Sequence, residues 1–324
     1  MNNKPVLKVE DLTVSFESGG VDIEITDKVS FNIYPGEVFG LVGESGCGKT
    51  VTALALLKLL PMPGGKILSG RVFLNGKDIL SLSLMEIRKV RGRDITMIFQ
   101  EPSASMNPLL TVERQLMECF DYHEFKGDKT GRVRDLLTQV GFTDIERILH
   151  AFPHELSGGM LQRVMITMAL IMRPSLIIAD EPTTALDVTV QAQIMELLLD
   201  MKNKMDTSIL LITHNLGLIA QYADRLAVMY AGRIVEEADT DIFFDNPLHP
   251  YSRGLLNAIP RLDAGRDEIV PIQGQVPQPS DYLQGCRFRD RCSHAFSLCA
   301  GKPNLNLFDK KQRVACFLYD KENQ

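Results

Sequence analysis

The sequence predicts an α/β protein whose core is a parallel β-sheet. Four short and nearly continuous apolar runs are typical of strands that are buried on both faces: residues 38–42, 95–99, 176–179 and 209–213. Helical patterns follow these runs at residues 50–60, 161–172 and 190–204. Because strands and helices alternate along the chain, the expected architecture is a sheet covered by helices.

The N-terminal part is predicted to form an antiparallel β subdomain of its own. Strand-like segments lie at residues 6–16, 28–33 and 71–74, and turn dipeptides such as Asn75-Gly76 punctuate the segment. The first apolar run of the parallel sheet begins only after the second of these strands.

Two further regions depart from the strand–helix alternation. Helical periodicity without strand character predicts an inserted helical subdomain at about residues 101–165. Beyond residue 245 repeated prolines interrupt the chain, and four cysteines follow. We therefore expect one large domain at residues 1–245 and a small extension at residues 246–324.

Composition limits the possible functions. The chain has 324 residues, of which 45% are apolar and 23% charged, as in an ordinary globular protein. A net charge of −6 gives no general electrostatic reason to bind nucleic acid. The N-terminus lacks the apolar core of a signal peptide, and no run approaches the roughly 18 apolar residues of a membrane span. We therefore expect a cytosolic chain whose role at a membrane, if it has one, depends on a partner.

A phosphate-binding loop is predicted between the strand at 38–42 and the helix at 50–60. Its pattern is G-x-x-x-x-G-K-[ST], formed by Gly43, Glu44, Ser45, Gly46, Cys47, Gly48, Lys49 and Thr50. Glycines let the backbone wrap around phosphates, and the amides at the helix start point at anionic oxygens. Lys49 would reach the β- and γ-phosphates of a nucleoside triphosphate, and Thr50 would ligate Mg²⁺.

An acidic pair supplies the matching second element. The strand at 176–179 delivers Asp180 to the magnesium shell, and Glu181 can accept a proton from the attacking water or orient it. Many phosphate-loop proteins share these two elements, so by themselves they predict only a nucleoside triphosphate.

A third motif opens the helix at 161–172. Ser157, Gly158 and Gly159 could be an ordinary helix cap. In this position, however, they resemble the signature sequence of ATP-binding-cassette (ABC) proteins, although Met160 stands where many members carry Gln. The resemblance implies that this helix start binds the γ-phosphate held by the other subunit of a dimer.

The remaining cassette motifs follow in order. Gln100 resembles the glutamine whose amide touches Mg²⁺ or the attacking water, and Asp187 ends a segment that resembles the loop at the dimer interface. His214 resembles the switch histidine that hydrogen-bonds the γ-phosphate, and Phe16 resembles the aromatic residue that stacks on adenine. Taken singly, a histidine at a strand end could be structural and a phenylalanine in a strand could be core.

The resemblance implies two composite ATP sites in a closed dimer. One chain would supply Lys49, Thr50, Gln100, Asp180, Glu181 and His214. The other would supply Ser157, Gly159 and Asp187. Hydrolysis would then be phosphoryl transfer to water, driven by positioning and charge neutralisation.

Other segments resemble the ATPases of dipeptide/oligopeptide importers, the peptide/nickel importer group. These segments are residues 100–108, 181–189 and 246–251, the last containing His-Pro-Tyr. The resemblance implies two membrane permease subunits, a second ATPase that is a paralogue or an identical chain, an extracytoplasmic solute-binding protein acting indirectly, and a place on the cytoplasmic face of the membrane. Uptake of nickel, a metal chelate or haem is an alternative within transport. A non-transport ATPase that senses redox state or iron is an alternative of another class.

The C-terminal cysteines are candidate metal ligands. They are Cys286, Cys292, Cys299 and Cys316. Four thiolates can hold tetrahedral zinc or a [4Fe–4S] cluster, and no pair has the roughly two to four intervening residues of a zinc knuckle. The tail also resembles the C-terminal region of dipeptide-importer ATPases, for which an iron–sulfur cluster is known. Zinc, and unligated or disulfide-bonded cysteines, remain alternatives.

Overall fold

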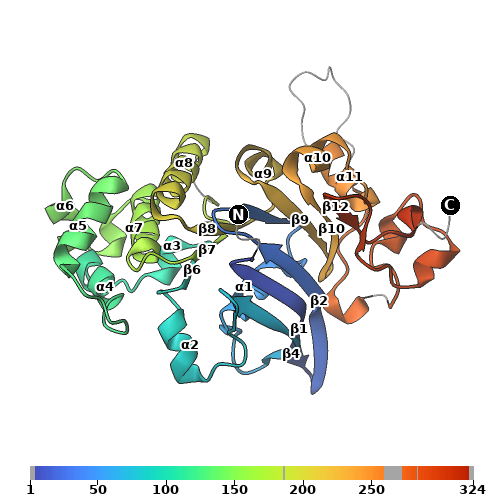
Figure 1. Cartoon of the computed structure of the whole chain (residues 1–324), viewed down its shortest axis with the longest axis horizontal. Coiled ribbons are helices and arrows are strands. Elements are labelled where there is room, and N and C mark those ends of the chain that lie inside the picture. Colours follow the sequence, from blue (N-terminus) through green and yellow to red (C-terminus); the bar gives the residue numbers. More distant parts are fainter. Residues whose placement is uncertain (1–3, 185–186, 259–271, 283, 321–324) are drawn as a thin grey trace. The chain divides into compact units, whose positions relative to one another are not determined.

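The structure, a computed structural model, describes residues 4–184, 187–258, 272–282 and 284–320 (Figure 1). The chain divides into two units, each made of separate stretches of sequence. Unit 1 comprises Met1–Leu7, Ile33–Glu37 and Phe73–Leu211; unit 2 comprises Lys8–Asn32, Val38–Val72 and Ile212–Gln324. The expected domain break at residue 245 stays a prediction.

The N-terminal strands of unit 2 form a sheet in which β2 (Val21–Ile33), β1 (Leu7–Ser18) and β4 (Gly65–Leu74) are neighbours in that order. The side chains of Leu12 and Val14 are fully buried. The Val14 amide donates to the Thr26 hydroxyl at 2.9 Å, which ties β1 to β2. The structure thus contains the predicted N-terminal β subdomain.

A second sheet in unit 2 carries the phosphate-binding loop. Its strand order is β11 (Asn306–Leu307), β12 (Gln312–Val314), β10 (Arg233–Asp239), β9 (Arg225–Tyr230) and β3 (Val38–Val42). Strands β3 and β9 run parallel, whereas β9–β10, β10–β12 and β11–β12 are antiparallel. Figure 1 shows that β12, coloured red, lies beside β10 although the two are far apart in sequence.

The helices of unit 2 are short. The α-helices are α1 (Lys49–Leu56), α9 (Leu216–Tyr222), α10 (Thr240–Asp245) and α11 (Pro250–Asn257). Single 3₁₀ turns punctuate the C-terminal extension: η2 (Pro279–Asp281), η3 (Arg289–Arg291), η4 (Ser297–Ala300) and η5 (Phe317–Tyr319). The extension is therefore held by strand pairing and side-chain contacts more than by regular helices.

The buried strands of unit 1 are β6 (Ile95–Ile98), β7 (Leu176–Asp180) and β8 (Ser208–Thr213). The Ser208–Leu211 part of β8 belongs to this unit. Strands β6 and β7 are parallel and pair Ile98 with Ala179. Every residue of β7 and β8 is buried, as expected for continuous apolar runs. The short strand β5 (Lys77–Asp78) pairs with the end of β4.

Unit 1 also holds the helical insertion. The helices of unit 1 as a whole are α2 (Leu84–Val90), α3 (Pro102–Ser105), α4 (Val112–Glu118), α5 (Lys129–Gln139), α6 (Ile145–His150), η1 (Pro153–Glu155), α7 (Gly158–Leu170) and α8 (Val188–Met205). Helices α3, α4 and α5 all pack against α7 (Figure 1). Fully buried Leu136, Val164 and Leu170 contribute to this core.

One predicted helix is shorter than expected. The helix predicted at residues 50–60 ends at Leu56, because Lys58 adopts a left-handed conformation with φ 51° and Pro61 follows. No helix among the described residues is long and apolar enough to span a bilayer.

Candidate functional site

The phosphate-binding loop joins β3 to α1 within unit 2, as the sequence predicts. Gly43, Gly46 and Gly48 all have positive φ angles, so the backbone turns sharply before the helix begins at Lys49. Ser45, Gly46 and Thr50 are exposed, whereas Lys49 is only 6% exposed. The loop can therefore present backbone amides and a hydroxyl to an anion.

Lys49 is folded over the loop that precedes it. Its Nζ donates to the carbonyl oxygens of Gly43 at 2.8 Å and of Glu44 at 3.0 Å. The Cys47 Sγ lies 3.7 Å from the same nitrogen. Burial raises the pKa of the Cys47 thiol, an effect that the charge of Lys49 only partly offsets. The lysine charge is thus placed within the loop that would hold the phosphates.

Gly43 is required by space as well as by conformation. A Cβ at this position would lie 2.1 Å from the carbonyl oxygen of Met229 and 2.8 Å from Cys47 Sγ, at a φ of +154°. No side chain can occupy that position, because the obstacle is backbone. Strand β9, which carries Met229, therefore helps to shape the loop.

Two more predicted site residues lie in unit 2. Phe16 is half-buried on β1, and His214 is exposed directly after β8. The structure places both in the same unit as the phosphate-binding loop.

The acidic pair lies in unit 1 at the end of β7. Asp180 is 2% exposed, and Glu181 follows with a left-handed φ of 46°. Glu181 Oε2 accepts hydrogen bonds from Gln100 Nε2 at 3.0 Å and from the Thr184 hydroxyl at 2.9 Å. Gln100 and Glu181 are thus brought together as the sequence predicts, whereas the role of Thr184 was missed because hydroxyl residues in turns are common.

The two predicted dimer-facing elements in unit 1 are both helix N-termini. The exposed Ser157 caps α7 by accepting a hydrogen bond from the Met160 amide at 3.4 Å. Asp187 caps α8 in the same way, accepting from the Val190 amide at 3.0 Å. Ala185 and Leu186, which precede Asp187 in the predicted interface loop, lie outside the described residues.

The helix cap at Ser157 leaves the start of α7 open to an anion. Gly158 is exposed and Gly159 half-buried, and a Cβ on Gly159 would approach Val190 Cγ1 to 3.1 Å. Glycine is therefore favoured there by the packing of α7 on α8. The structure shows the helix cap, and a helix cap does not exclude an anion site at the same helix start.

The predicted site residues thus fall into two groups. Unit 2 holds Phe16, Gly43, Glu44, Ser45, Gly46, Cys47, Gly48, Lys49, Thr50 and His214. Unit 1 holds Gln100, Ser157, Gly158, Gly159, Asp180, Glu181 and Asp187.

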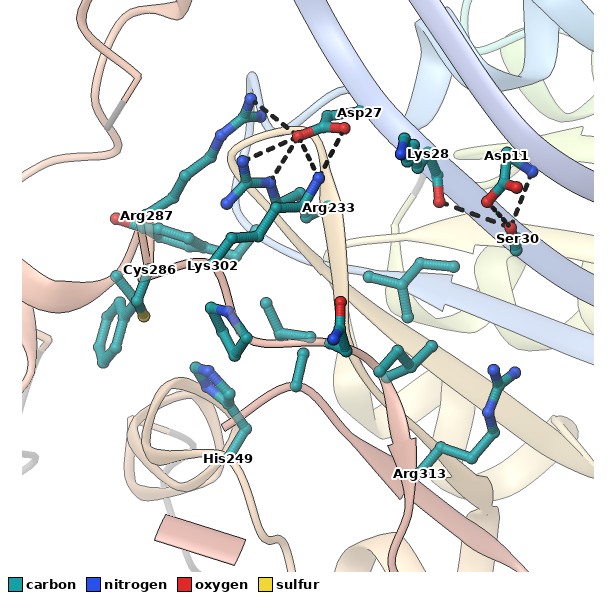
Figure 2. A pocket seen from close by; sticks show the side chains of 18 residues that line it. Asp11, Asp27, Lys28, Ser30, Arg233, His249, Cys286, Arg287, Lys302 and Arg313 are labelled. Carbon is teal, nitrogen blue, oxygen red and sulfur yellow. Dashed lines mark hydrogen bonds and ion pairs between the residues drawn. The ribbon is translucent and has the colours of Figure 1, made fainter. Parts of the chain in front are cut away.

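An ion-pair cluster in unit 2 holds the C-terminal extension to β2 and β10. Figure 2 shows Asp27 facing three cationic side chains. Arg233 Nε lies 2.8 Å and Lys302 Nζ 2.8 Å from Asp27 Oδ2, and the Arg287 guanidinium lies 3.5 Å away. Burial would raise the pKa of Asp27, but the hydrogen bond from Lys302 and the charge of Arg233 hold that pKa below its usual value. These groups line a cavity of about 330 Å³.

The four C-terminal cysteines line one smaller cavity of unit 2, together with His249, Phe288 and His294. All four are free thiols, so a disulfide is absent from this group. Burial raises the pKa of Cys286, of Cys292 and, to about 11, of Cys316.

The expected metal-binding group is not supported by this arrangement. Among the residues that the structure describes, no three His, Cys, Asp or Glu side chains are grouped so that they could hold a metal ion. The four cysteine side chains thus share a cavity, but as they stand they are not grouped as a metal-ligand set.

Two contacts escaped the sequence analysis altogether. Arg291 and Tyr251, both in the C-terminal region, hydrogen-bond Glu44 of the phosphate-binding loop. No local pattern connects residues so far apart, so only the folded chain reveals these contacts.

Comparisons with known proteins agree with this geometry. The family model "ABC transporter" matches residues 26–184, and the model "Oligopeptide/dipeptide transporter, C-terminal region" matches residues 235–299. The oligopeptide transport ATP-binding protein AppD of Bacillus subtilis (strain 168) is 47% identical over 98% of this chain and 98% of its own length. The dipeptide transport ATP-binding protein DppD of the same organism is 45% identical over 97% of this chain and 95% of its own length.

Solved structures share the fold. A dimeric ATP-binding cassette in a post-hydrolysis state with ADP and Pi matches with a TM-score of 0.64 and 26% identity, covering 72% of this chain and 98% of that one. A part of the ABC transporter complex cbiONQ from Clostridium perfringens matches with a TM-score of 0.63 and 27% identity, covering 75% and 92%. The fold is therefore that of an ABC ATPase cassette.

Proposed function

The chain belongs to the ATP-binding subunits of oligopeptide/dipeptide ABC transporters, and on that premise we propose that it hydrolyses ATP to drive import of di- and oligopeptides. The observation that carries the proposal is the union of a complete cassette with the family's C-terminal region in one chain. A cassette alone would indicate ATP hydrolysis without a class of solute.

The reaction is transfer of the γ-phosphoryl group of ATP to water, which yields ADP and phosphate. The loop amides and Lys49 bind the β- and γ-phosphates, and Glu181 orients the attacking water and receives its proton. Gln100 and Thr184 fix the orientation of the Glu181 carboxylate. His214 is assigned to the γ-phosphate and Phe16 to the adenine ring.

Mg²⁺ is assigned to three oxygen ligands of this chain. The Thr50 hydroxyl, the Asp180 carboxylate and the Gln100 amide oxygen are hard donors of the kind that this ion prefers, and Thr50 is exposed at the start of α1. When bound, the ion neutralises charge on the phosphates.

A second chain completes each site in this proposal. Ser157, Gly158 and Gly159 at the start of α7 would bind the γ-phosphate held by the partner, and Asp187 would line the interface. The exposure of Ser157 and Asp187 supports this assignment. We further propose that the partner ATPase is a paralogue. Affinity purification from the native cell should recover a second ATPase with two permease subunits; recovery of this chain alone with the permeases would indicate a homodimer.

The solute is best tested in the assembled transporter. We expect ATP hydrolysis in proteoliposomes, with the cytoplasmic face of the complex outward, to rise when a di- or oligopeptide and the solute-binding protein are supplied inside. Stimulation by nickel, a metal chelate or haem, and none by peptide, would establish the alternative transport function. Stimulation by an oxidant without any permease would instead favour the redox-sensing ATPase.

A groove in unit 1 is proposed as the contact for the permease. It has a volume of about 230 Å³ and is lined by residues of β6, α3, α4 and α7, including Met165 of α7, and by Phe99 and Met106, which directly follow β6 and α3. Tyr122, which is 77% exposed, stands at its rim. Apolar, methionine-rich walls suit a short helix from another chain.

Substitution at the rim tests this contact. Tyr122→Asp should abolish permease-dependent stimulation and leave ATP binding by the isolated chain unchanged. Met85→Asp, at a residue 67% exposed on α2 and outside the groove, is the matched control and should behave as wild type. Full stimulation of the Tyr122→Asp complex would exclude the groove as the permease contact.

We also propose that Cys286, Cys292, Cys299 and Cys316 hold a [4Fe–4S] cluster, with zinc as the alternative. Four free thiols line one cavity, and they would have to move closer together around the metal to hold it. Chain purified without oxygen should contain about four irons with equivalent acid-labile sulfide. Cys292→Ser should lose them and Cys119→Ser, outside the cavity, should keep them. Zinc without iron would favour the alternative, and absence of both metals would overturn the proposal.

A further inference from the structure

Arg291 of the C-terminal extension forms a two-pronged ion pair with Glu44 of the phosphate-binding loop. Its two terminal nitrogens lie 2.8 Å and 3.1 Å from the two carboxylate oxygens. The Arg291 side chain is only 7% exposed and Glu44 is 31% exposed. Bidentate and largely dehydrated pairs of this kind are directional and stronger than surface ion pairs.

The backbone of Glu44 is held as well. Its amide donates to the Tyr251 hydroxyl at 2.9 Å, and its carbonyl oxygen accepts from Lys49 Nζ at 3.0 Å. Tyr251 belongs to the His-Pro-Tyr segment that opens α11 and is fully buried. The side chain and the amide of one loop residue are therefore both bound by the C-terminal region, while its carbonyl helps to position the phosphate-binding lysine.

The groups that hold Glu44 are themselves fixed. The rings of Tyr230, Tyr251 and Phe288 pack together with centroid distances of 4.6, 5.2 and 5.4 Å. The Arg291 guanidinium lies over Tyr230 and Phe288, and its Nε donates to the Gln273 carbonyl at 2.9 Å. Because the arginine has little freedom left, it can impose its position on the loop.

We propose that the C-terminal extension sets the affinity of the phosphate-binding loop for nucleotide, with Arg291 and Tyr251 as positioning residues that act through Glu44. The inference rests on the proposed role of this loop in binding ATP. A structural change in the extension next to Arg291, for example at the adjoining Cys292, would then change the affinity of the loop for nucleotide.

MgADP binding to the full-length chain, measured by titration calorimetry, tests the proposal without hydrolysis. Arg291→Met should weaken MgADP binding about tenfold, the effect of losing one charge-assisted contact. The affinity of Arg291→Lys for MgADP should lie between those of wild type and Arg291→Met, because lysine keeps the charge and loses the two-pronged geometry. Arg289→Met, on the same turn, is the control and should bind as wild type, because the Arg289 side chain pairs with the neighbouring Asp290.

Two further measurements separate positioning from general loss of structure. Glu44→Gln and Arg291→Met should weaken MgADP binding by similar factors. The double variant should bind MgADP no more weakly than either single variant. In the assembled transporter Arg291→Met should raise the KM for ATP and leave kcat at saturating ATP within about twofold of wild type. Tyr251→Phe, which removes only the hydroxyl, should show a smaller change of the same kind.

Each outcome has a distinct meaning. If wild-type chain fails to bind MgADP, the proposed function itself is wrong. If wild type binds and Arg291→Met binds equally well, or if the Glu44 and Arg291 effects simply multiply, the positioning role is wrong while the proposed function stands.

Discussion

The Gln100 side-chain amide donates to the Glu181 carboxylate, with 3.0 Å between Nε2 and Oε2. The contact follows from the register of the sheet in unit 1. Strands β6 and β7 are parallel and pair Ile98 with Ala179, so the residues that follow both strands emerge at the same edge. The chain thus places an amide beside the carboxylate that we assign to the attacking water.

Replacing this carboxylate should stop turnover without preventing nucleotide binding. Glu181→Gln removes the proton acceptor, and general-base catalysis of this kind contributes about 100-fold or more. We expect steady-state hydrolysis to fall by that factor while ATP still binds and holds the dimer together. Glu196→Gln, on the exposed side of α8, should hydrolyse ATP normally. Ordinary turnover by Glu181→Gln would disprove the role assigned here.

Gly43→Ala should destabilise the chain strongly. The new Cβ would meet the Met229 carbonyl oxygen, and the φ of +154° is unsuited to alanine, so we expect a loss of about 3 kcal/mol in free energy of unfolding. Gly76→Ala, at a φ of +81° with nothing within 4 Å, has only the conformational cost of about 1 kcal/mol. Denaturant titration of both variants measures the difference, and equal losses would refute the steric argument.

Alkylation of Cys47 should inactivate the chain, but slowly at neutral pH. The thiol is fully buried and its pKa is raised above the ordinary value, so little reactive thiolate exists. The rate of modification should therefore still be rising at pH 9, about tenfold per pH unit while the thiol remains protonated. Mass spectrometry of Cys47 after timed exposure to iodoacetamide, with and without ATP, checks both the profile and protection by nucleotide. A rate that levels off below pH 8 would contradict the burial.

His249 should make the chain less stable in weak acid. Burial lowers its pKa from 6.5 to about 3, and its Nδ1 accepts a hydrogen bond from the Tyr251 amide at 3.0 Å. Between those two pH values the unfolded chain binds a proton that the folded chain does not. The contribution of His249 to the free energy of unfolding is therefore fully present above pH 6.5 and decreases as the pH is lowered. At pH 5 the loss is about 2 kcal/mol.

His249→Asn tests this account, because asparagine can accept the same hydrogen bond but does not titrate. The free energy of unfolding of the variant should change less between pH 8 and pH 5 than that of wild type. His154→Asn, at an exposed position, should leave the wild-type slope unchanged. An identical slope in the His249→Asn variant would show that other groups cause the acid sensitivity.

The catalytic core could be predicted from sequence because its signals are local. The strand at 38–42 matches β3, and the acidic pair lies at the end of β7, of which Asp180 is the last residue. Periodicity also located α7 and α8 to within a few residues. A motif whose residues adjoin one strand and one helix needs no knowledge of the rest of the chain.

The features that could not be predicted from the sequence depend on contacts between residues that are far apart in the chain. Strands β9 and β10 escaped prediction, and β12 owes its conformation to its partner β10 more than to its own three residues. The Glu44–Arg291 pair likewise joins segments that no periodicity relates. The cysteine spacing was noticed, but whether four thiols converge is a matter of packing, and the expected ligand set was not found among the described residues.

The pairing of β12 with β10 makes the C-terminal region inseparable from the cassette. Gln312 on β12 is buried and donates to Glu236 of β10 at 2.9 Å. A chain cut at the predicted boundary near residue 245 would expose an open strand edge and leave a buried carboxylate short of a donor. Truncation there would generate an aggregation-prone fragment, so natural or engineered shortening must stop beyond β12.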